Sequence, residues 1–300
     1  MSLLLIPLPK ISHLLLATIH MITYITWNIS PDIFTIPEIM GFGPFTVRWY
    51  GLLFAAGFLI GQQIMAHIFK KEGKPLEDID SLTLVMVAST VLGARIGHFL
   101  FYEPSILYKN PLEVILPPYA GLASHGALVG ILFGLWLYTR KRQSTGQTFL
   151  WLTDRMVILV ALAGAFIRFG NLMNSEIVGT VTGMPWGMVF MQNMEFSQYP
   201  RHPAQLYESI SCLILFFILF SLWNKYKANT PPGRLLGLFL VWIFGLRFMY
   251  EFLKENQVQF EDSLPLNMGQ FLSIPAVLLG IYLIVQSTKS KRITSEKVLV

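Results

Sequence analysis

The sequence GAFIRFGNLMNSEIVG, residues 164–179, decides how the whole chain is interpreted. It ends a long uncharged apolar run, after which Arg168, Asn171, Asn174 and Glu176 follow within nine positions. In a helix, Arg168 and Asn171 share a face because they are three residues apart. A charge in the middle of a membrane helix costs about 2.5–3.5 kcal/mol. A single arginine could reach the interface with its long side chain, but the polar cluster beside it indicates a functional site.

The composition outside this stretch is that of a membrane protein. Of the 300 residues, 54% are hydrophobic and 13% are charged, whereas about 25% are charged in an average globular protein. The net charge of +5 must first be divided between two sides of a membrane before it says anything about partners. The single cysteine, Cys212, lies in an apolar run, so no disulfide framework and no structural metal site are expected. We therefore predict an all-α, polytopic membrane protein.

Seven apolar segments are each close to the roughly twenty residues that a helix needs to cross a bilayer. They are residues 46–67, 81–102, 120–139, 151–171, 206–224, 235–253 and 267–286. Residues 21–300 are expected to form a single transmembrane domain with a periplasmic segment at about 172–205. Residues 1–20 are predicted to be a doubtful N-terminal extension, because two prolines interrupt their apolar part and Met21 offers a more ordinary start.

Basic residues divide the connections between these segments into two groups. Thirteen of them lie after the first, third, fifth and seventh segments: Lys70, Lys71, Lys74, Arg140, Lys141, Arg142, Lys225, Lys227, Arg234, Lys289, Lys291, Arg292 and Lys297. The opposite connections hold Lys109, Arg201 and Lys254, with Lys10 in the doubtful extension. By the positive-inside rule, the N-terminus lies outside and the C-terminus in the cytoplasm. Residues 164–179 therefore end on the outer side.

Four arginines lie inside or at the edge of apolar segments, namely Arg48, Arg95, Arg168 and Arg247. Exposed to lipid, they would together cost on the order of 10 kcal/mol. We therefore expect them to face a shared polar interior that binds an anion. Phosphate is the obvious anion in a membrane, because the planar guanidinium binds its oxygens in a bidentate manner.

Polar residues in the other segments allow both structural and functional interpretations. Arg95, His98 and Tyr102 share one helical face, which is more often a structural hydrogen-bonded stripe. His125 opens the third segment among small residues. A lone histidine is usually a satisfied polar group, but a neutral imidazole at the outer end of a span is also suited to general base catalysis.

Two further clusters lie at the fifth and sixth segments. The start of the fifth segment holds Arg201, His202, Gln205, Tyr207 and Glu208. In the sixth segment, Arg247 and Glu251 are one turn apart and can pair, either to aim the guanidinium inward or only to neutralise both charges. The sequence contains no motif of a serine hydrolase, a zinc hydrolase or a P-loop protein.

These motifs together resemble the bacterial prolipoprotein diacylglyceryl transferase family. The family signature, G-R-x-G/A-N-F-x-N-x-E-x-x-G, is similar to residues 167–179, with Ile167 in place of a glycine and Leu172 in place of an aromatic residue. The resemblance covers about residues 25–290 and includes VRWYGLLFAAG around Tyr50, GARIG around Arg95, SHGALVG around His125, PRHPAQLYE, the Arg247/Glu251 helix and GQFLSIP near Gln270. The chain departs from the family at Ile243, where a tyrosine is often found.

The resemblance implies an activity, a location and a set of partners. Members of this family transfer the diacylglyceryl group of phosphatidylglycerol to the lipobox cysteine thiol of a preprolipoprotein, forming a thioether and releasing glycerol phosphate. The implied location is the bacterial inner membrane. The implied partners are phosphatidylglycerol, preprolipoprotein signal peptides with a lipobox cysteine, and membrane lipids. No metal, soluble cofactor or nucleic acid is implied.

The candidate residues fit this chemistry. Arg168 and Arg247 are expected to stabilise the negative charge that develops on the leaving oxygen. His125 is expected to remove the thiol proton, because a thiol with a pKa of about 8.5 is mostly protonated at neutral pH. Gly179 is expected to permit a tight backbone turn at the outer mouth. The residues expected to bind and orient the substrate are Tyr50, Arg95, Arg168, Asn171, Glu176, Gly179, His202 and Glu251.

A transporter or channel for an anionic lipid or small anion would also line a membrane cavity with arginine. A structural subunit whose arginines pair with lipid headgroups is a further alternative. Transporters often show paired repeats and broken helices, and this chain has no convincing internal repeat. Its polar residues gather at the outer ends of the segments, which favours a reaction on a surface lipid.

Overall fold

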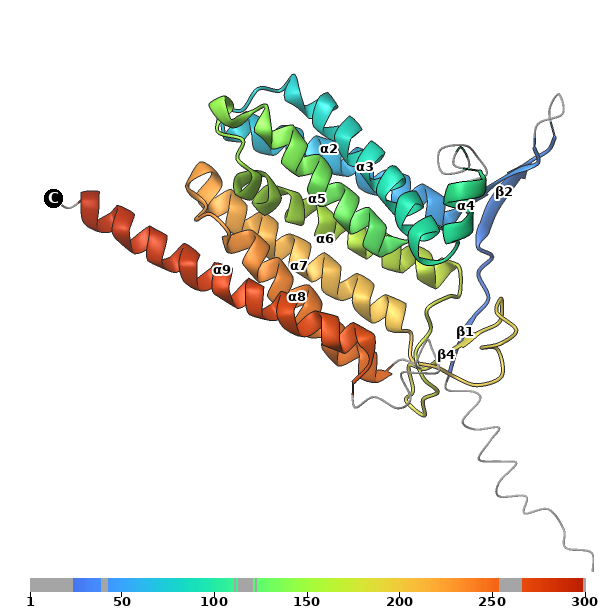
Figure 1. Ribbon diagram of the computed structural model, residues 1–300. Coiled ribbons are helices and arrows are strands. Elements are labelled where there is room, and N and C mark those ends of the chain that lie inside the picture. The colour runs from blue at the N-terminus through green and yellow to red at the C-terminus, as the bar shows by residue number, and fades with distance from the viewer. Residues whose placement is uncertain are drawn as a thin grey trace, which may run out of the picture.

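The computed structural model describes residues 24–38, 43–110, 112, 121, 123–253 and 266–298, with the backbone alone from residue 290 onward. The predicted extension, residues 1–20, lies outside these residues. Long helices dominate the described chain (Figure 1), which confirms the predicted all-α membrane fold. They are α2 (Trp49–Lys71), α3 (Asp78–Phe101), α5 (Ser124–Arg140), α6 (Phe149–Met173), α7 (Ala204–Tyr226), α8 (Arg234–Tyr250) and α9 (Met268–Val298).

Among the described residues, six helices are long and apolar enough to cross a membrane: α2, α3, α6, α7, α8 with the following turn η4 (Glu251–Leu253), and α9. Such segments form helices because a bilayer leaves backbone groups no other hydrogen-bond partners. The third predicted segment corresponds to α5, which has 17 residues and begins at Ser124 rather than at residue 120. It is thus a shorter helix than the sequence predicts.

Helix α5 packs closely on α3 through glycines on both helices. A Cβ atom on Gly93 would lie 2.5 Å from the carbonyl oxygen of Gly126, and one on Gly97 would lie 2.6 Å from the Cα atom of Gly126. Small residues of this kind let membrane helices approach until their backbones touch. Helices α3 and α5 therefore form a tight pair.

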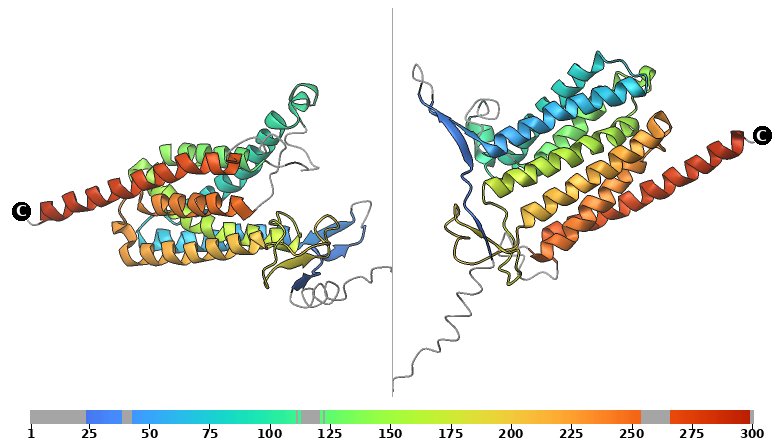
Figure 2. Two further views of the ribbon diagram at one scale, coloured as in Figure 1. Left: turned by 90° about the horizontal axis from the view of Figure 1, so that it is seen from below. Right: turned by 180° about the vertical axis from the view of Figure 1, so that it is seen from behind.

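The strands and the short helix α4 gather at one end of the helix bundle, away from the C-terminal end of α9 (Figures 1 and 2). Strand β1 (Ile25–Trp27) pairs in parallel with β4 (Met188–Phe190), and β2 (Asp32–Ile36) pairs in antiparallel fashion with β3 (Phe45–Arg48). The short helix α4 (Pro104–Lys109) lies at the same end. We call this the strand end. The basic residues that predict the cytoplasmic side lie at the opposite end, which we call the basic end.

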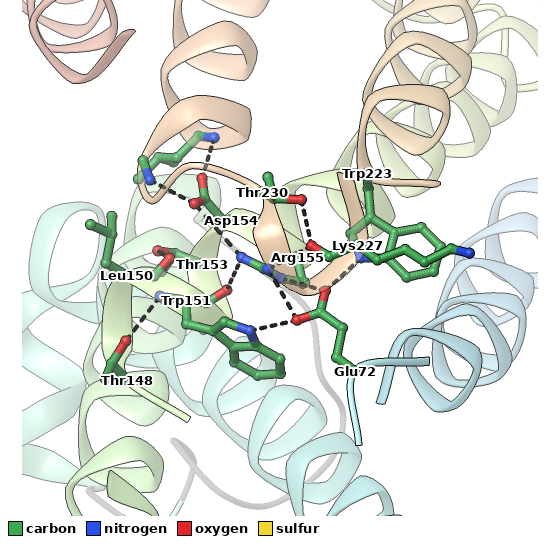
Figure 3. Close-up of polar contacts among 12 residues, drawn as sticks. Glu72, Thr148, Leu150, Trp151, Thr153, Asp154, Arg155, Trp223, Lys227 and Thr230 are labelled. Atoms are coloured by element: carbon green, nitrogen blue, oxygen red, sulfur yellow. Dashed lines mark hydrogen bonds and ion pairs between the residues drawn. The ribbon is translucent and has the colours of Figure 1, made fainter. Parts of the chain in front are cut away.

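A buried ion pair, which was not predicted from the sequence, ties helices together at the basic end (Figure 3). Arg155 of α6 donates from Nε and Nη2 to the two carboxylate oxygens of Glu72, at 3.1 and 3.0 Å. The side chains are 2% and 1% exposed. The indole Nε1 atoms of Trp151 and Trp223 donate to the same carboxylate at 2.8 and 2.6 Å. These four donors compensate for the loss of water that makes buried charge costly.

A second buried carboxylate lies beside this pair in Figure 3. Asp154 accepts hydrogen bonds from the backbone N–H groups of Gly233 and Leu236, at 2.6 and 2.8 Å. It therefore satisfies N–H groups that have no partner within the first turn of α8. Together the two carboxylates join the basic ends of α2, α6, α7 and α8, and the strand end contains the residues of the predicted site.

Candidate active site

Arg168 lies five residues before the end of α6 and contacts the first turns of α7. Its Nε atom is 2.5 Å from Oε2 of Glu208, and its Nη1 donates to Oδ1 of Asn171 at 3.4 Å. The arginine side chain is 29% exposed, whereas that of Glu208 is 11% exposed. The carboxylate thus holds the guanidinium from the protein side while part of the guanidinium stays accessible to a ligand.

The polar chain continues from Arg168 to Glu176. Asn171 donates from Nδ2 to Oε1 of Glu176 at 2.7 Å, and Asn174 donates to the same oxygen at 3.3 Å. Each amide is oriented by this bond, because its Nδ2 must face the carboxylate. Asn171 consequently turns its Oδ1 toward Arg168. The structure therefore brings together three residues that the sequence predicted, and adds Glu208 as the partner of the arginine.

Tyr50 reaches this cluster from α2 because Gly170 of α6 has no side chain. A Cβ atom on Gly170 would lie 2.9 Å from Cδ2 and 3.1 Å from Cα of Tyr50. The tyrosine ring therefore packs on α6 at the residue next to Asn171. It also stacks on Phe54, with 6.5 Å between the ring centroids.

Arg247 forms the second arginine position, on α8. Its Nε atom lies 3.6 Å from Oε1 of Glu251, which confirms the predicted pair one helical turn apart. Asn267, which the sequence interpretation did not select, donates from Nδ2 to the other carboxylate oxygen at 3.2 Å. The absence of a side chain on Gly269 makes room for this carboxylate, because a Cβ there would lie 2.8 Å from Cδ of Glu251. The carboxylate is thereby held between α8 and the start of α9.

Gly179 joins the two arginine positions through the backbone. Its N–H donates to the carbonyl of His202 at 2.9 Å, and the N–H of Thr180 donates to the carbonyl of Leu253 at 2.7 Å. A Cβ on Gly179 would lie 2.8 Å from Cβ of His202 and 2.9 Å from the oxygen of Leu253. The prediction that Gly179 permits a tight turn is corrected: its φ angle is not left-handed, and glycine is required because neighbouring backbones come so close.

His202 lies beside this contact, outside the helices. Burial lowers the pKa of its imidazole, which favours a neutral ring at neutral pH. Its Nδ1 shares a hydrogen bond of 3.2 Å with the hydroxyl of Tyr207, and Trp186 donates from Nε1 to that hydroxyl at 2.9 Å. Because the hydroxyl accepts from the indole, we assign its proton to the bond with Nδ1. His202 thus positions the hydroxyl of Tyr207, whose ring centroid lies 6.4 Å from that of Tyr250 on α8.

Comparison with known proteins identifies the family of this chain. The sequence profile of the family described as prolipoprotein diacylglyceryl transferase matches residues 37–286. The chain belongs to the prolipoprotein diacylglyceryl transferase family. As a member of this family it is an enzyme, a membrane-embedded transferase of lipoprotein biosynthesis, and the transporter and structural-subunit alternatives are set aside.

The relatives that it resembles are phosphatidylglycerol–prolipoprotein diacylglyceryl transferases. That of Chloroherpeton thalassium is 43% identical over 272 residues, which cover 90% of this chain and 97% of the relative. That of Tolumonas auensis is 43% identical over 255 residues, which cover 85% and 96%. That of Bacteroides fragilis is 38% identical over 286 residues, which cover 91% and 99%.

The remaining residues that were predicted for the shared polar interior or for the diacylglyceryl transferase site are Arg48, Arg95 and His125. Arg48 pairs with Asp32 at 2.9 Å and is 62% exposed, so the expectation that it faces a shared interior is wrong. Arg95 is buried in α3, with its guanidinium 4.6 Å from the ring centroid of Phe99. His125 is exposed on the first turn of α5 and makes no hydrogen bond or ion pair with another described residue.

The transferase also contains an apolar crevice between α2, α3, α5 and α6, with a volume of about 230 Å³. It is lined by Phe54 of α2, Met86 and Thr90 of α3, Ile131 of α5 and Ile167 of α6, among others. Since Ile167 directly precedes Arg168, the crevice runs along the membrane-embedded part of the bundle toward the polar cluster. Within the described ranges, no three His, Cys, Asp or Glu side chains are grouped closely enough to ligate a metal ion.

Proposed function

We propose that this chain transfers the diacylglyceryl group of phosphatidylglycerol to the thiol of a prolipoprotein cysteine, with Arg168 stabilising the departing phosphate. The observation that carries this proposal is the state of Arg168. Glu208 and Asn171 hold its guanidinium at the end of an apolar helix, and part of it remains exposed. A guanidinium fixed in this way matches the oxygens of a phosphodiester.

The reaction exchanges one bond for another at a glycerol carbon. The thiolate sulfur attacks the carbon that carries the phosphate ester, a C–S bond forms, and the C–O bond breaks. The bonding electrons move onto the phosphate oxygen, so glycerol phosphate leaves with an additional negative charge. A preorganised positive charge at that oxygen stabilises the transition state more than the ground state, and loss of one such donor typically slows turnover by about 10²–10³-fold.

We assign Arg247 to the same anionic headgroup from the opposite side. Glu251, which Asn267 binds in turn, pairs with it on α8, and the side chain of Arg247 is 43% exposed. Two arginines on different helices can bind different oxygens of one phosphate. Asn171 and Glu176 then orient Arg168, while Tyr50 and His202 border the space in which the headgroup would lie.

The apolar crevice supports a diacylated substrate. Its lining side chains are mostly apolar, and one of them belongs to Ile167, which directly precedes Arg168 on α6. An acyl chain placed there would leave the glycerol backbone level with Arg168. Burial of such a chain is favourable because each CH₂ removed from water contributes about 0.8 kcal/mol.

We assign His125 to the thiol. It is exposed at the strand end of α5, which the basic residues predict to be the outer side. An exported cysteine would arrive there, and a neutral imidazole is suited to accept its proton. The corresponding location is the bacterial inner membrane, with preprolipoproteins as the protein substrate.

The test is an assay of the purified protein in detergent micelles with phosphatidylglycerol and a lipobox peptide. Mass spectrometry should detect the diacylglyceryl peptide adduct. Arg168→Ala should reduce adduct formation by at least about 10²-fold, and Arg168→Lys should restore little, because a point charge cannot replace a bidentate fork.

The matched control is Arg140→Ala, which removes an arginine from the basic end, where its guanidinium packs over Trp136. This variant should keep wild-type activity. No adduct from the wild-type protein would refute the proposed function. Wild-type activity in Arg168→Ala would refute the assignment of the arginine.

A further inference from the structure

The turn that follows α6 contains two non-glycine residues in the left-handed conformation. Ser175 has a φ angle of 53° and Ile177 one of 57°. This conformation places Cβ close to the next carbonyl oxygen in an L residue, and it is a true outlier for a β-branched side chain such as isoleucine. Backbone of this kind persists only where the surrounding structure holds it.

The end of the helix explains Ser175 but not Ile177. The N–H of Ser175 donates to the carbonyl of Leu172 at 3.0 Å, and the N–H of Glu176 donates to that of Asn171 at 3.1 Å. These two bonds form a Schellman motif, which requires a left-handed residue directly after the helix. Ile177 lies two residues further on, so its conformation must be held from outside the helix.

Two side chains from other parts of the chain hold this turn. Gln205, on the first turn of α7, donates from Nε2 to the carbonyl of Glu176 at 2.6 Å. Asn193, after β4, donates from Nδ2 to the carbonyl of Ser175 at 3.0 Å. Both side chains thus bind backbone carbonyls within the turn: that of Ser175, which is itself left-handed, and that of Glu176, which lies between the two left-handed residues.

The surroundings of Gln205 show that the hydrogen bond to the carbonyl of Glu176 fixes the orientation of its amide. The side chain is fully buried, and its Oε1 has no hydrogen-bond partner among the described residues. A buried acceptor without a partner is unfavourable. Rotating the amide would not relieve this, because it would place Oε1 against the carbonyl oxygen of Glu176. The orientation is therefore determined by the turn.

The carboxylate of Glu176 leaves this turn toward Asn171, and Asn171 in turn contacts Arg168. Gln205 lies three residues before Glu208 on α7, so the two side chains share one helical turn. This turn therefore contacts both ends of the polar chain, with Gln205 at Glu176 and Glu208 at Arg168. We propose that Gln205 and Asn193 are positioning residues, which hold residues 175–177 in their left-handed turn and thereby keep Glu176 on Asn171 and Asn171 on Arg168. This inference rests on the proposed function of the Arg168 cluster.

The experiment first removes each side-chain donor to the turn and then relieves the backbone strain at Ile177. Gln205→Leu deletes the amide at similar volume, and Asn193→Asp keeps the oxygen that accepts from the N–H of Glu195 while losing the donor. Each variant should lower kcat in the adduct assay by roughly 5- to 30-fold, the range expected when a strained residue is released. Ile177→Gly should restore most of that loss, because glycine adopts positive φ without the Cβ clash.

Matched controls separate this role from a general loss of structure. Ile177→Gly alone should keep wild-type kcat, since the side chain is partly exposed. Val181→Gly removes another exposed β-branched side chain, at a residue without positive φ, and should restore nothing. If Gln205→Leu does not fold, Asn193→Asp with and without Ile177→Gly decides the question. Unchanged kcat in the donor variants, no restoration by Ile177→Gly, or equal restoration by Val181→Gly would overturn the proposal.

A second measurement is independent of activity. Hydrogen exchange of the segment 174–179 should be faster in Gln205→Leu than in the wild-type protein and should return toward the wild-type rate on addition of Ile177→Gly. If the wild-type protein forms no adduct, the proposed function fails, and this exchange pattern still decides the inference. Exchange that is unchanged in Gln205→Leu would overturn it.

Discussion

At the scale of single residues, arginines of this chain differ in what their guanidinium groups contact. Arg155 is buried, and Glu72 binds its Nε and Nη2 atoms. Arg48 is exposed and pairs with Asp32. Arg168 is intermediate, because Glu208 and Asn171 orient it while part of its surface stays accessible. A guanidinium that is both oriented and accessible can bind a phosphate without first breaking a buried ion pair. The groups that an arginine contacts, rather than its being an arginine, therefore decide whether it can bind the substrate.

His125 gives the first prediction at this scale. Because its imidazole is exposed and has no hydrogen-bond partner among the described residues, it can take up a proton from a thiol. His125→Ala should lower turnover by about 10²–10⁴-fold, as expected for loss of a general base. The residual rate should rise with pH, because the thiol then ionises without help.

Initial rates of adduct formation across acidic to alkaline pH will test this. The control is His67→Gln, which changes a histidine near Trp223 at the basic end and should leave the pH profile unchanged. If His125→Gln keeps both the wild-type rate and the wild-type pH profile of adduct formation, the histidine has a structural role.

At the scale of helices, two kinds of contact hold the bundle. Glycines of α3 and α5 bring two backbones together, whereas Glu72 and Arg155 join helices by buried charge. Between the α3/α5 pair and helices α2 and α6, the packing leaves the apolar crevice. The same arrangement that stabilises the bundle thus leaves an apolar space of about 230 Å³, lined among others by Ile167, the residue before Arg168.

Filling the crevice should impair use of the lipid. Thr90 lines it from α3, and among the described residues its hydroxyl bonds only within its own helix, to the carbonyl of Met86. Thr90→Phe should displace about two CH₂ groups of an acyl chain and lower kcat/KM for phosphatidylglycerol by roughly tenfold. Leu84→Phe is the control, because Leu84 is exposed on the same helix. An equal loss in both variants would argue against an acyl-chain site.

The buried ion pair should be important for stability. Glu72→Ala leaves the guanidinium of Arg155 buried without its carboxylate and should lower the free energy of unfolding by about 3–5 kcal/mol. Combining Glu72→Gln with Arg155→Met should recover part of this, because no buried charge remains and the single amide oxygen still accepts from one of the two indoles, Trp151 or Trp223. Asp32→Ala, which breaks an exposed pair, should change stability by about 0–1 kcal/mol.

Thermal unfolding in micelles, followed by tryptophan fluorescence, measures all of these variants. A Tm for Glu72→Ala equal to that of Asp32→Ala would show that the buried pair does not hold the helices together.

At the scale of the whole molecule, the bundle has two chemically different ends. The strand end carries the arginine positions, His125 and His202, and the basic end carries lysines, arginines and the buried pair. Such asymmetry orients a membrane protein, because basic residues stay on the cytoplasmic side. The site is consequently predicted to face the periplasm, where lipoprotein precursors emerge.

A topology experiment tests this orientation. A reporter that works only in the cytoplasm should be active when fused after Val300. A reporter that requires export should be active when inserted after Met194, a highly exposed residue between α6 and α7. An export-dependent reporter active after Val300 would contradict the predicted sidedness.

The sequence alone was sufficient to predict those contacts whose interacting groups are close along the chain. Apolar runs of about twenty residues must become helices in a bilayer, because only a helix satisfies its own backbone there. The contacts of Arg168 with Asn171 and of Arg247 with Glu251 follow from helical spacing. The same locality made Asn171 and Glu176 recognisable as one cluster.

Only the tertiary structure decided which distant residues meet. Glu208 pairs with Arg168, Asn267 with Glu251, and Arg155 with Glu72. In contrast, Arg48 turned outward to Asp32. The physical reason is that helical periodicity states which residues share a face but not which helix that face meets. Close packing, such as the glycine contacts of α3 and α5, sets which helices are neighbours, how each is rotated about its axis and how deep it lies in the membrane. The pairing of charged side chains follows from this packing.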